Sequence, residues 1–520
     1  MKSLYLFQAA HPHATTTMSL PYAPRFAYYD GKLQSGSSTS SFQTIDPATA
    51  EPIANIHTTT HGAIDSAIAS AQKAFPAWSA TPCIERARIL QRAAALLRAR
   101  NDEIARIETR DTGKPFSETS TVDVVTGADV LEFMANLVGG GGMNGETAQL
   151  RPDAWVYTTK NSLGVCAGIG AWNYPIQIAL WKSAPCLAAG NCMVYKPSEF
   201  TPLHSTVLAE IYAEAGVPAG VFNVVQGGGE VGAYLTKHPG IAKVSFTGQV
   251  STGQKVAGSA AGEMKYVTME LGGKSACIIL PDADLEQAVD GAMMANFFST
   301  GQVCTNGTRV FVPKAMQSDF EKLLLQKIEY IRAGDVSDPN TNFGPLVSKP
   351  HYEKVISYIR HGIETDKATL LCGGPETPSF LTSHPNKAYK NGYWVRPTVF
   401  TSCTDSMKIV REEIFGPVMC ILPYSSVDEA VARANATPMG LAAGVFTSNL
   451  NLAHKVVAQL EAGITWVNTW GESPAEMSVG GWKMSGVGVE NGKKGLEAWV
   501  RGKSTLVEMG GAVPTVFAKL

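Results

Sequence analysis

The fold follows from five short apolar segments that helix-like stretches separate: VCAGIGA (165–171), NCMVYKPS (191–198), VFNVVQGG (221–228), KVSFTG (243–248) and SACIILP (275–281). Strands that alternate with helices are typical of a parallel sheet with crossover helices. A second series follows at TRVFVPK (308–314), TLLCGG (369–374), VMCILPY (418–424), GVFTS (444–448) and ITWVNTW (464–470). The sequence therefore predicts an α/β fold with two lobes, and a cleft between them is the expected site.

The N-terminal part has a different pattern. Residues 31–41 are rich in Gly and Ser and predict a loop, whereas residues 62–110 show a helical periodicity. Residues 374–392 contain three prolines and predict a surface loop. We find no internal repeat, charge block or low-complexity segment, so we expect a compact chain throughout.

Composition excludes several classes of partner. A net charge of -2 and a pI near 6.6 provide no positive field for nucleic acid or an anionic membrane surface. No run of about 20 apolar residues predicts a membrane-spanning helix. The nine cysteines are scattered without metal-type spacing, which favours free thiols in a reducing compartment and hence the cytoplasm. Residues 1–19 contain no acidic residue, so a mitochondrial presequence is the alternative, and Met18 is an alternative start.

Two glycine-rich turns are candidates for binding a dinucleotide. GGGEVG (227–232) follows an apolar strand and has the spacing G-x-G-x-x-G. FTGQVSTG (246–253) also ends a strand and opens a helix, whose first backbone amides could hold a pyrophosphate. Spacing alone does not choose between them.

A third strand end, YKPSE, carries Lys196 and Glu199. Cofactors bind at the carboxyl edge of open α/β sheets, where Glu199 could accept hydrogen bonds from ribose hydroxyls. A carboxylate at this place opposes a 2'-phosphate and favours NAD over NADP. Lys196 beside it weakens that discrimination, so NADP stays as an alternative.

Three further residues together suit aldehyde oxidation. Cys304 lies among small and polar residues before a Thr-Asn-Gly turn, which suits an accessible thiol. A thiolate can add to an aldehyde, expel hydride to a nicotinamide and leave a thioester for water to hydrolyse. Glu270, which precedes two glycines, could activate that water, and Asn173 could join the Cys304 amide in an oxyanion hole.

The chain resembles the aldehyde dehydrogenase superfamily from about Thr44 to Met509. AWNYP, KPSE, MELGGK, GQVCTNGTR, EEIFGP and GGWKMSGVG occur together in that family's order. The resemblance implies a nucleophile at Cys304, a general base at Glu270 and an oxyanion donor at Asn173. It also implies that FTGQVSTG is the cofactor loop and GGGEVG a neighbouring turn. The implied cofactor contacts are Trp172, Lys196, Pro197, Ser198, Glu199, Gly248, Gln249, Val250, Ser251, Gly253, Gly272, Glu413 and Phe415.

Within the superfamily the chain is most similar to betaine aldehyde dehydrogenases and the related trimethylaminobutyraldehyde enzymes, through WNYPIQIALWKSAP and VNTWGESPAEM. We expect Tyr174, Trp181 and Trp470 to hold a quaternary ammonium group, which has no hydrogen to donate and must contact ring faces. Tyr174 and Trp181 are seven residues apart and would share one face of a helix. The alternatives are an amino-aldehyde or aliphatic aldehyde substrate, a non-catalytic protein, and an enzyme that transfers the acyl group to coenzyme A or phosphate.

The same resemblance implies potassium at Thr44, Ile45 and Asp111, and at Lys483 with Gly486, mainly through backbone oxygens. It assigns a charge relay to Lys182 and Glu490. The chain departs from the family beside this relay, where Val489 replaces an arginine and Ser478 a proline.

We also expect a division into domains and a homo-oligomer. The resemblance implies a Rossmann-like cofactor domain, a catalytic domain and a β arm that joins subunits into a dimer or tetramer. The expected boundaries are an N-terminal extension at 1–29, a cofactor domain at 30–145 and 167–272, a catalytic domain at 273–466 and an arm at 146–166 and 485–510.

Overall fold

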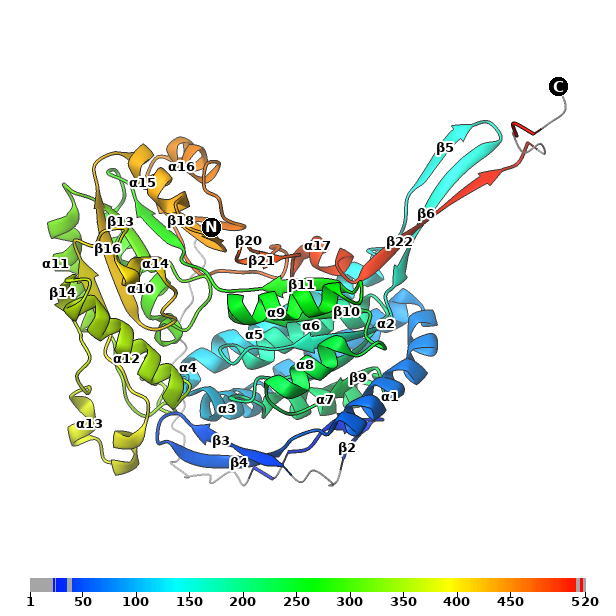
Figure 1. Cartoon of the computed structure of the whole chain (residues 1–520), viewed down its shortest axis with the longest axis horizontal. Coiled ribbons are helices and arrows are strands. Elements are labelled where there is room, and N and C mark those ends of the chain that lie inside the picture. Colours follow the sequence, from blue (N-terminus) through cyan, green and yellow to red (C-terminus); the bar gives the residue numbers. More distant parts are fainter. Residues whose placement is uncertain (1–21, 24, 35–39, 511–514, 518–520) are drawn as a thin grey trace.

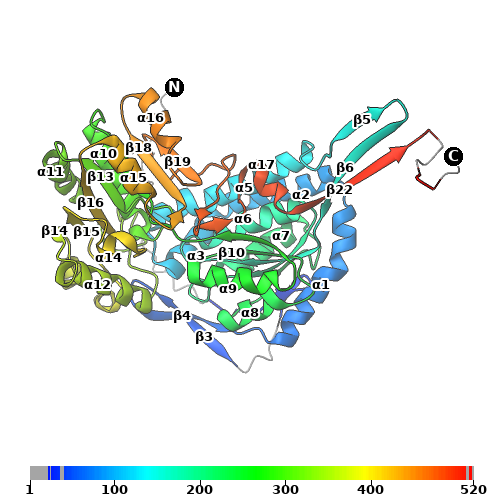
Figure 2. The ribbon, with the colours of Figure 1, turned by 45° about the horizontal axis from the view of Figure 1, so that its top comes forward.

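The computed structural model describes residues 22–23, 25–34, 40–510 and 515–517. Most of the expected N-terminal extension, together with the alternative start at Met18 and the presequence, lies outside the described residues. Over the described residues the fold is α/β, with two lobes and a three-stranded arm that projects from one of them (Figures 1 and 2). The predicted fold class is confirmed.

The first lobe is built on an eight-stranded sheet with the order β2-β1-β9-β8-β7-β10-β11-β21. The five strands from β9 to β11 in this order are parallel, and β21 and β1 pair antiparallel to them. The strands are β1 (Tyr28–Tyr29), β2 (Lys32–Leu33), β7 (Val165–Ile169), β8 (Cys192–Lys196), β9 (Phe222–Val224), β10 (Lys243–Thr247), β11 (Tyr266–Glu270) and β21 (Gly486–Val487).

Helices cover both faces of this sheet. α1, α8 and α9 contact one another or the strands on one side, and α6 and α7 pack together on the other. The first-lobe helices are α1 (His61–Ala80), α2 (Cys83–Ala99), α3 (Asn101–Thr112), α4 (Phe116–Glu118), the π-helical turn η1 (Thr119–Asp123), α5 (Val124–Gly139), α6 (Pro175–Ala188), α7 (His204–Ala215), α8 (Gly229–Lys237), α9 (Val250–Ala261) and α17 (Gly492–Glu497). The predicted helical region at 62–110 corresponds to α1, α2 and α3.

The strand order of this sheet reverses at its centre. From β7 the chain adds β8 and then β9 on one side, and it crosses over to add β10 and β11 on the other. In open α/β sheets, ligands bind outside the carboxyl ends of the strands at such a switch point. The loops after β7 and β10, which begin at Gly170 and Gly248, flank this crevice.

The second lobe is built on a seven-stranded sheet with the order β14-β15-β16-β13-β12-β18-β19, parallel except for the edge strand β14. Its strands are β12 (Ala276–Ile279), β13 (Arg309–Pro313), β14 (Thr369–Cys372), β15 (Thr398–Thr401), β16 (Val418–Tyr424), β18 (Ala442–Phe446) and β19 (Ile464–Val467). Its helices are α10 (Leu285–Phe297), the 3-10 turn η2 (Phe298–Gly301), α11 (Gln317–Ile328), α12 (Lys349–Glu364), α13 (Phe380–Ser383), the 3-10 turn η3 (Lys387–Asn391), α14 (Lys408–Arg411), α15 (Val427–Asn435) and α16 (Leu450–Val457).

The segment at 374–392 is more structured than the sequence suggested. It contains α13 and η3, and its Leu381 and Tyr389 are buried against Ala48, Val336 and Trp394. The prediction of a surface loop was therefore wrong in part, because apolar residues spaced between the prolines form a small core of their own.

Short pairs of strands complete the fold. The hairpin of β3 (Ser41–Asp46) and β4 (Glu51–His57) lies beneath the first lobe, and β17 (Met439–Gly440) pairs with β20 (Trp482–Lys483) (Figure 1). The arm consists of β5 (Thr147–Arg151), β6 (Ala154–Ser162) and β22 (Val500–Glu508), in the order β22-β6-β5. Across the residues described, no helix is both long enough and apolar enough to cross a membrane.

Candidate active site

Glu270 ends β11 and is buried at the carboxyl edge of the first sheet. The antiparallel strand β21 holds it from the other side, since Glu270 is the register partner of Gly486. Burial raises the pKa of Glu270 well above its usual range, the negative charge of Glu490 raises it further, and Lys182 opposes the shift. The raised pKa gives Glu270 a higher proton affinity than an exposed glutamate has, which suits a general base.

Cys304 lies in the loop that follows η2. Within η2, Ser299 and Thr300 have left-handed backbone angles, with φ of 51° and 55°. Gly301 is required in this loop, because a Cβ at its position would lie 2.3 Å from the backbone of Gly416. The backbone before Cys304 is thus strained and closely packed, and backbone strain is common at functional sites.

Cys304 is half-buried, whereas the sequence predicted an accessible thiol. Burial raises the pKa of its thiol to about 12, and the negative charges of Glu413 and Glu270 add to the shift. The thiol is therefore protonated at neutral pH and needs a base before it can act as a nucleophile.

A small pocket connects the Cys304 loop with two other predicted segments. Its lining residues are Gly273, Gly301, Val303, Asn306, Thr308, Glu413, Ile414 and Phe415. Glu413 accepts a hydrogen bond of 3.0 Å from the Gly273 backbone N–H. Its carboxylate lies directly against Gly272, where a Cβ would be 2.2 Å from Oε2. MELGGK, GQVCTNG and EEIFGP therefore meet at one place, as the sequence led us to expect.

Asn173 is buried in the turn that leads into α6. Its Nδ2 donates a hydrogen bond of 3.0 Å to the carbonyl oxygen of Gln302, two residues before Cys304. The Gln302 side chain in turn accepts from the Val347 N–H at 3.0 Å. An amide donor is thus fixed beside the Cys304 loop, with its second N–H left to serve another acceptor.

The two glycine-rich turns lie near the same sheet edge. Lys196 is buried at the end of β8, 3.6 Å from the Glu199 carboxylate, and its side chain runs beside Gly232 of α8. α9 begins after Gln249 with no side chain capping its first turn, so its amides are open to an anion. Gly253 packs α9 tightly onto the first sheet, because a Cβ there would lie 2.3 Å from Leu271. FTGQVSTG follows β10 at the switch point, which favours it over GGGEVG.

An aromatic group stands beside the pocket and includes a residue that the sequence did not suggest. The ring centroid of Trp172 is 5.2 Å from that of Phe415 and 5.0 Å from that of His351. A ring nitrogen of His351 lies 2.7 Å from the Phe415 carbonyl oxygen, and burial lowers the pKa of His351 to about 4. His351 is therefore a neutral support for Phe415, which has the left-handed φ of 63°. A lone histidine on α12 gave no signal of this role.

The expected aromatic box is partly assembled. Trp470 is buried in the second-lobe core, where its ring covers Gly307 and Gly444. Trp181 packs against the cores of both lobes, and the second-lobe cluster that it contacts also contains Cys304 and Trp470. Tyr174 precedes α6 instead of lying within it, so the argument from one helix face was inexact.

Tyr174 is also engaged by the protein itself. Its hydroxyl bonds Ser299 Oγ at 2.7 Å, and the Lys114 ammonium stands 3.8 Å from the centre of its ring. One face of this ring is therefore already occupied by a cation from the protein.

Behind Tyr174 lies a buried group that the sequence analysis missed, here called the acid-rich cluster: Glu108, Lys114, Glu118 and Asp123. Lys114 pairs closely with Asp123 and lies 3.7 Å from Glu118, which accepts a short hydrogen bond from Ser299. Burial raises the pKa of Glu118 to about 7 and raises the pKa values of Glu108 and Asp123. Three carboxyl groups thus share one lysine, which favours their protonated forms.

Lys182 and Glu490 are brought together, although 308 residues separate them in the chain. Lys182 Nζ donates to Glu490 Oε1 at 2.7 Å and to Ser245 Oγ at 3.0 Å, and Ser245 Oγ donates to Glu490 Oε1 at 3.1 Å. We call these three buried residues the relay triangle. Glu490 is held by backbone bonds of 2.7 and 2.8 Å to Val479, which follows the unusual Ser478.

The expected cation sites differ from each other. Thr44 Oγ1 donates to Asp111 Oδ1 at 2.6 Å, and the Leu203 N–H donates to Asp111 Oδ2 at 2.9 Å. Ile45 follows Thr44 in β3. Burial raises the pKa of Asp111 to about 7, so a buried carboxyl group that lacks a lysine partner is available to a cation. Among the residues that the structure describes, no group of three or more His, Cys, Asp or Glu side chains is arranged to hold a metal ion.

At the second expected site the Lys483 ammonium is held by the protein itself. It donates to the carbonyl oxygens of Asn435 and Thr437 at 2.8 and 3.1 Å and pairs with Glu461 at 2.5 Å. Gly486 lies three residues on, beside Glu270. The ligands that the resemblance implies here are backbone oxygens, so a potassium site at Lys483 and Gly486 stays a prediction.

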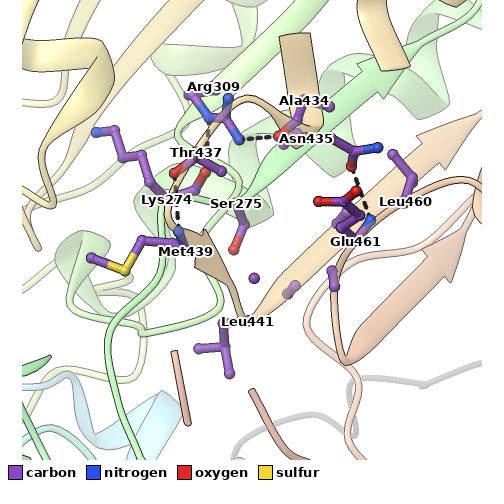
Figure 3. Close-up of a pocket in the computed structure, with 15 residues that line it drawn as sticks. Lys274, Ser275, Arg309, Ala434, Asn435, Thr437, Met439, Leu441, Leu460 and Glu461 are labelled. Atoms are coloured by element: carbon purple, nitrogen blue, oxygen red, sulfur yellow. Dashed lines mark hydrogen bonds between the residues drawn. The ribbon is translucent and has the colours of Figure 1, made fainter. Parts of the chain in front are cut away.

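A separate pocket borders this region (Figure 3). Ser275, Thr437, Leu441 and Glu461 line it, and the Lys274 side chain points away from it in the close-up. The Arg309 guanidinium beside it is saturated by three backbone carbonyls, those of Lys274, Arg433 and Ala434. Its walls carry none of the residues expected to perform chemistry, so it is distinct from the Cys304 site.

Known proteins resemble the chain over nearly its whole length. A sequence model of the aldehyde dehydrogenase family matches residues 33–505. An NAD-dependent aldehyde dehydrogenase from Sinorhizobium meliloti is 34% identical, with 98% of this chain and 99% of that one covered and a TM-score of 0.92. A betaine aldehyde dehydrogenase from Staphylococcus aureus in complex with NAD+ is 34% identical, with 95% and 98% covered and a TM-score of 0.90. An indole-3-acetaldehyde dehydrogenase in complex with NAD+ is 35% identical, with 93% and 96% covered and a TM-score of 0.89. The chain belongs to the aldehyde dehydrogenase family.

Proposed function

We propose that the protein oxidises an aldehyde to its acid with NAD, and that betaine aldehyde, which yields glycine betaine, is its preferred substrate. The observation that carries the reaction is that the Cys304 loop, Glu413 and Gly273, three residues after Glu270, line one pocket, and that the charge of Glu270 acts on the Cys304 thiol. Membership of the aldehyde dehydrogenase family supports the same reaction.

The residues present fit a dinucleotide. The uncapped amides at the start of α9 suit a pyrophosphate, and the half-buried Glu413 carboxylate suits ribose hydroxyls. Glu199 at the adjacent strand end opposes a 2'-phosphate. Two of the similar proteins are described in complex with NAD+. When bound, the nicotinamide supplies the acceptor for the hydride that leaves the aldehyde carbon.

In this mechanism Glu270 acts as the base that activates water. The Cys304 thiol loses its proton to solvent, and the thiolate adds to the aldehyde carbon while the Asn173 amide and the Cys304 N–H hold the oxyanion. Loss of hydride from that carbon leaves a thioester on Cys304. Glu270 then takes a proton from water, the hydroxide adds to the thioester carbon, and the C–S bond breaks to release the acid and the thiolate. The raised pKa of Glu270 favours this proton transfer, and a base in this place favours water over coenzyme A or phosphate as acyl acceptor.

Three aromatic residues support a cationic substrate. Trp181 and Trp470 share a core cluster with Cys304, and Tyr174 follows Asn173 in the chain. The indole N–H groups of both tryptophans are buried without a hydrogen-bond partner. A trimethylammonium group needs ring faces and no hydrogen-bond acceptor, so this lining suits it. Amino-aldehydes and trimethylaminobutyraldehyde are the second candidate, because Glu118 places a carboxyl group behind the same ring.

Assembly and ions complete the proposal. Leu150, Leu506 and Met509 are exposed on the arm, which makes it a surface for a second copy in a dimer or tetramer. We propose the expected domains with a shorter arm, made of β5, β6 and β22, because β21, α17 and the start of β7, which the expected arm at 146–166 and 485–510 includes, belong to the first lobe. The pair of Thr44 and Asp111 suits potassium, and the free thiols suit the cytoplasm.

The test compares betaine aldehyde with its uncharged counterpart of the same shape, 3,3-dimethylbutanal. We expect kcat/KM for NAD reduction to be at least about tenfold higher with betaine aldehyde, since a desolvated cation–ring contact contributes about 2 kcal/mol. Cys304→Ala should abolish both reactions. Equal values for the two aldehydes would exclude the betaine assignment and leave the dehydrogenase, whereas reduction of NAD by Cys304→Ala would exclude the thiol mechanism. 4-Aminobutanal as a third substrate tests the second candidate.

A further inference from the structure

A serine hydroxyl connects the two charged members of the relay triangle. Ser245 is fully buried on β10. Its Oγ accepts from the Lys182 ammonium and donates to Glu490, so the hydroxyl proton has a fixed direction. The third bond, from Lys182 to Glu490, closes the ring. A closed ring of three buried polar groups holds each member in one orientation.

The triangle is continuous with Glu270 along one face of the first sheet. Side chains two residues apart on a strand share a face, so Thr247 lies on the same face of β10 as Ser245. Thr247 is the register partner of Glu270 on β11. Thr247 Oγ1 and Glu270 Oε1 are both buried without a hydrogen-bond partner. The unsatisfied oxygens of both residues therefore lie at the end of the strands where water must be activated.

Other charged or titratable groups also face the triangle. Glu270 faces it from β11, Lys243 from β10 and Tyr195 from β8. Lys243 Nζ donates a hydrogen bond of 2.7 Å to Thr268 Oγ1, outside the triangle. Ser245 is thus the hydroxyl that links Lys182 with Glu490, whereas Lys243 acts on the triangle only through its charge.

We infer that Ser245 is a positioning residue for thioester hydrolysis, because it fixes Lys182 and Glu490 so that the proton taken up by Glu270 can pass on to Glu490. In this transfer Glu270 gives up the proton that it took from water and is again a carboxylate. Glu490 accepts that proton and holds it. The step serves hydrolysis alone, since acylation of Cys304 consumes no water. The inference rests on the proposed function.

The test uses p-nitrophenyl acetate, which acylates a reactive thiol without any cofactor. In the wild-type protein, p-nitrophenolate should appear in a burst of one per Cys304, followed by a steady rate that reports hydrolysis of the thioester. Ser245→Ala is compared with Ser183→Ala. Ser183 is an equally buried serine on α6 whose hydroxyl bonds Tyr212 at 2.7 Å, away from the triangle. The control therefore loses a similar buried hydrogen bond.

We expect Ser245→Ala to keep the burst and to lower the steady rate about tenfold, since a hydrogen bond to a charged group is lost. Acetylated Cys304 should accumulate in the intact mass, and the pH at which hydrolysis reaches half its maximum should shift. Ser183→Ala should keep both phases. Ser245→Cys, which preserves volume but donates weakly, should give an intermediate rate and serves if the alanine variant does not fold.

Equal steady rates in Ser245→Ala and Ser183→Ala would overturn the inference. A loss of the burst together with the steady rate would also overturn it, because the serine would then support the loop of Cys304 and not hydrolysis. If the wild-type protein shows no burst that depends on Cys304, the proposed function itself fails.

Discussion

Two buried lysines stand beside the active site, and their surroundings differ. In the relay triangle, Lys182 meets one carboxylate, Glu490, and one hydroxyl, Ser245. In the acid-rich cluster, Lys114 meets Glu118 and Asp123, with Glu108 beside them. One positive charge balances one negative charge in the triangle, whereas the cluster has more carboxyl groups than cations.

The difference shows how a protein fixes charge in one place and leaves it adjustable in another. Burial disfavours ionised carboxyl groups unless a cation compensates them. In the cluster the compensation is shared, so the pKa of Glu118 rises to about 7 and its charge depends on pH near neutrality. A pH-dependent charge then lies behind Tyr174, at the expected substrate site, while the triangle next to Glu270 keeps its ion pair.

The largest effect is expected from Lys182→Met. This change leaves Glu490 buried without its cation, and breaking a buried pair on one side costs about 3–5 kcal/mol of unfolding free energy. Denaturant unfolding measures the cost. Lys493→Met, on the exposed face of α17, is the control and should cost under about 0.5 kcal/mol. If Lys182→Met and Lys493→Met lost the same unfolding free energy, the buried ion pair of the relay triangle would not be stabilising as described.

Lys114→Met should cost less, about 2 kcal/mol at about pH 6, because carboxyl groups with raised pKa values can take up protons when their cation is removed. The cost should grow at about pH 8, where the same groups lose protons. Unfolding at both values measures the difference. A cost that is independent of pH would mean that the cluster holds fixed charges as the triangle does.

Asp111 extends the comparison of the relay triangle with the acid-rich cluster, because it is a buried carboxyl group without a lysine partner. Its folded pKa of about 7 lies above the unfolded value of 3.8, so its contribution is complete at low pH and is lost as pH rises through about 7. Wild-type stability should therefore decline between about pH 4 and about pH 7, and Asp111→Asn should reduce the decline. Potassium chloride should add about 1 kcal/mol more at about pH 8 than sodium chloride does, and only in the wild type. Identical effects of the two salts would exclude the potassium site.

The smallest effect is expected from Ser299→Ala, which removes the hydrogen bonds to Tyr174 and Glu118. We expect KM for betaine aldehyde to rise about threefold to tenfold, since about 1 kcal/mol is lost, with little change in kcat. KM for 3,3-dimethylbutanal should hardly change, which provides the control within one variant. A fall in kcat with both aldehydes would show that Ser299 supports the Cys304 loop instead.

The pattern of the sequence was sufficient for most of the fold. Every apolar segment quoted in the two series became a strand, because period and turn residues specify strands locally. The sequence analysis did not predict β11 or β15. β11 lies in the segment that carries Glu270, and β15 is a four-residue strand that follows a proline. The arm was expected from family resemblance and not from its own pattern, because β5 and β6 have largely exposed or half-buried residues without a regular alternation.

Candidate functional groups whose chemistry depends on residue type could also be predicted from the sequence. A thiol in a turn, a carboxylate before two glycines and an uncapped glycine-rich strand end each show their character in a few neighbouring residues. His351, Ser245 and the acid-rich cluster could not be found in this way. Each is an ordinary residue of a helix or strand, and its role comes only from partners far away in the chain.

The sequence by itself determined the α/β alternation and predicted the candidate reactive groups, because these depend on residue types and on contacts a few residues apart. Tertiary structure decided which groups meet: Lys182 with Glu490, Tyr174 with Ser299, and Thr44 with Asp111. It also decided their proton affinities, because burial and the distance to a neighbouring charge set a pKa, and neither quantity exists until the chain has folded.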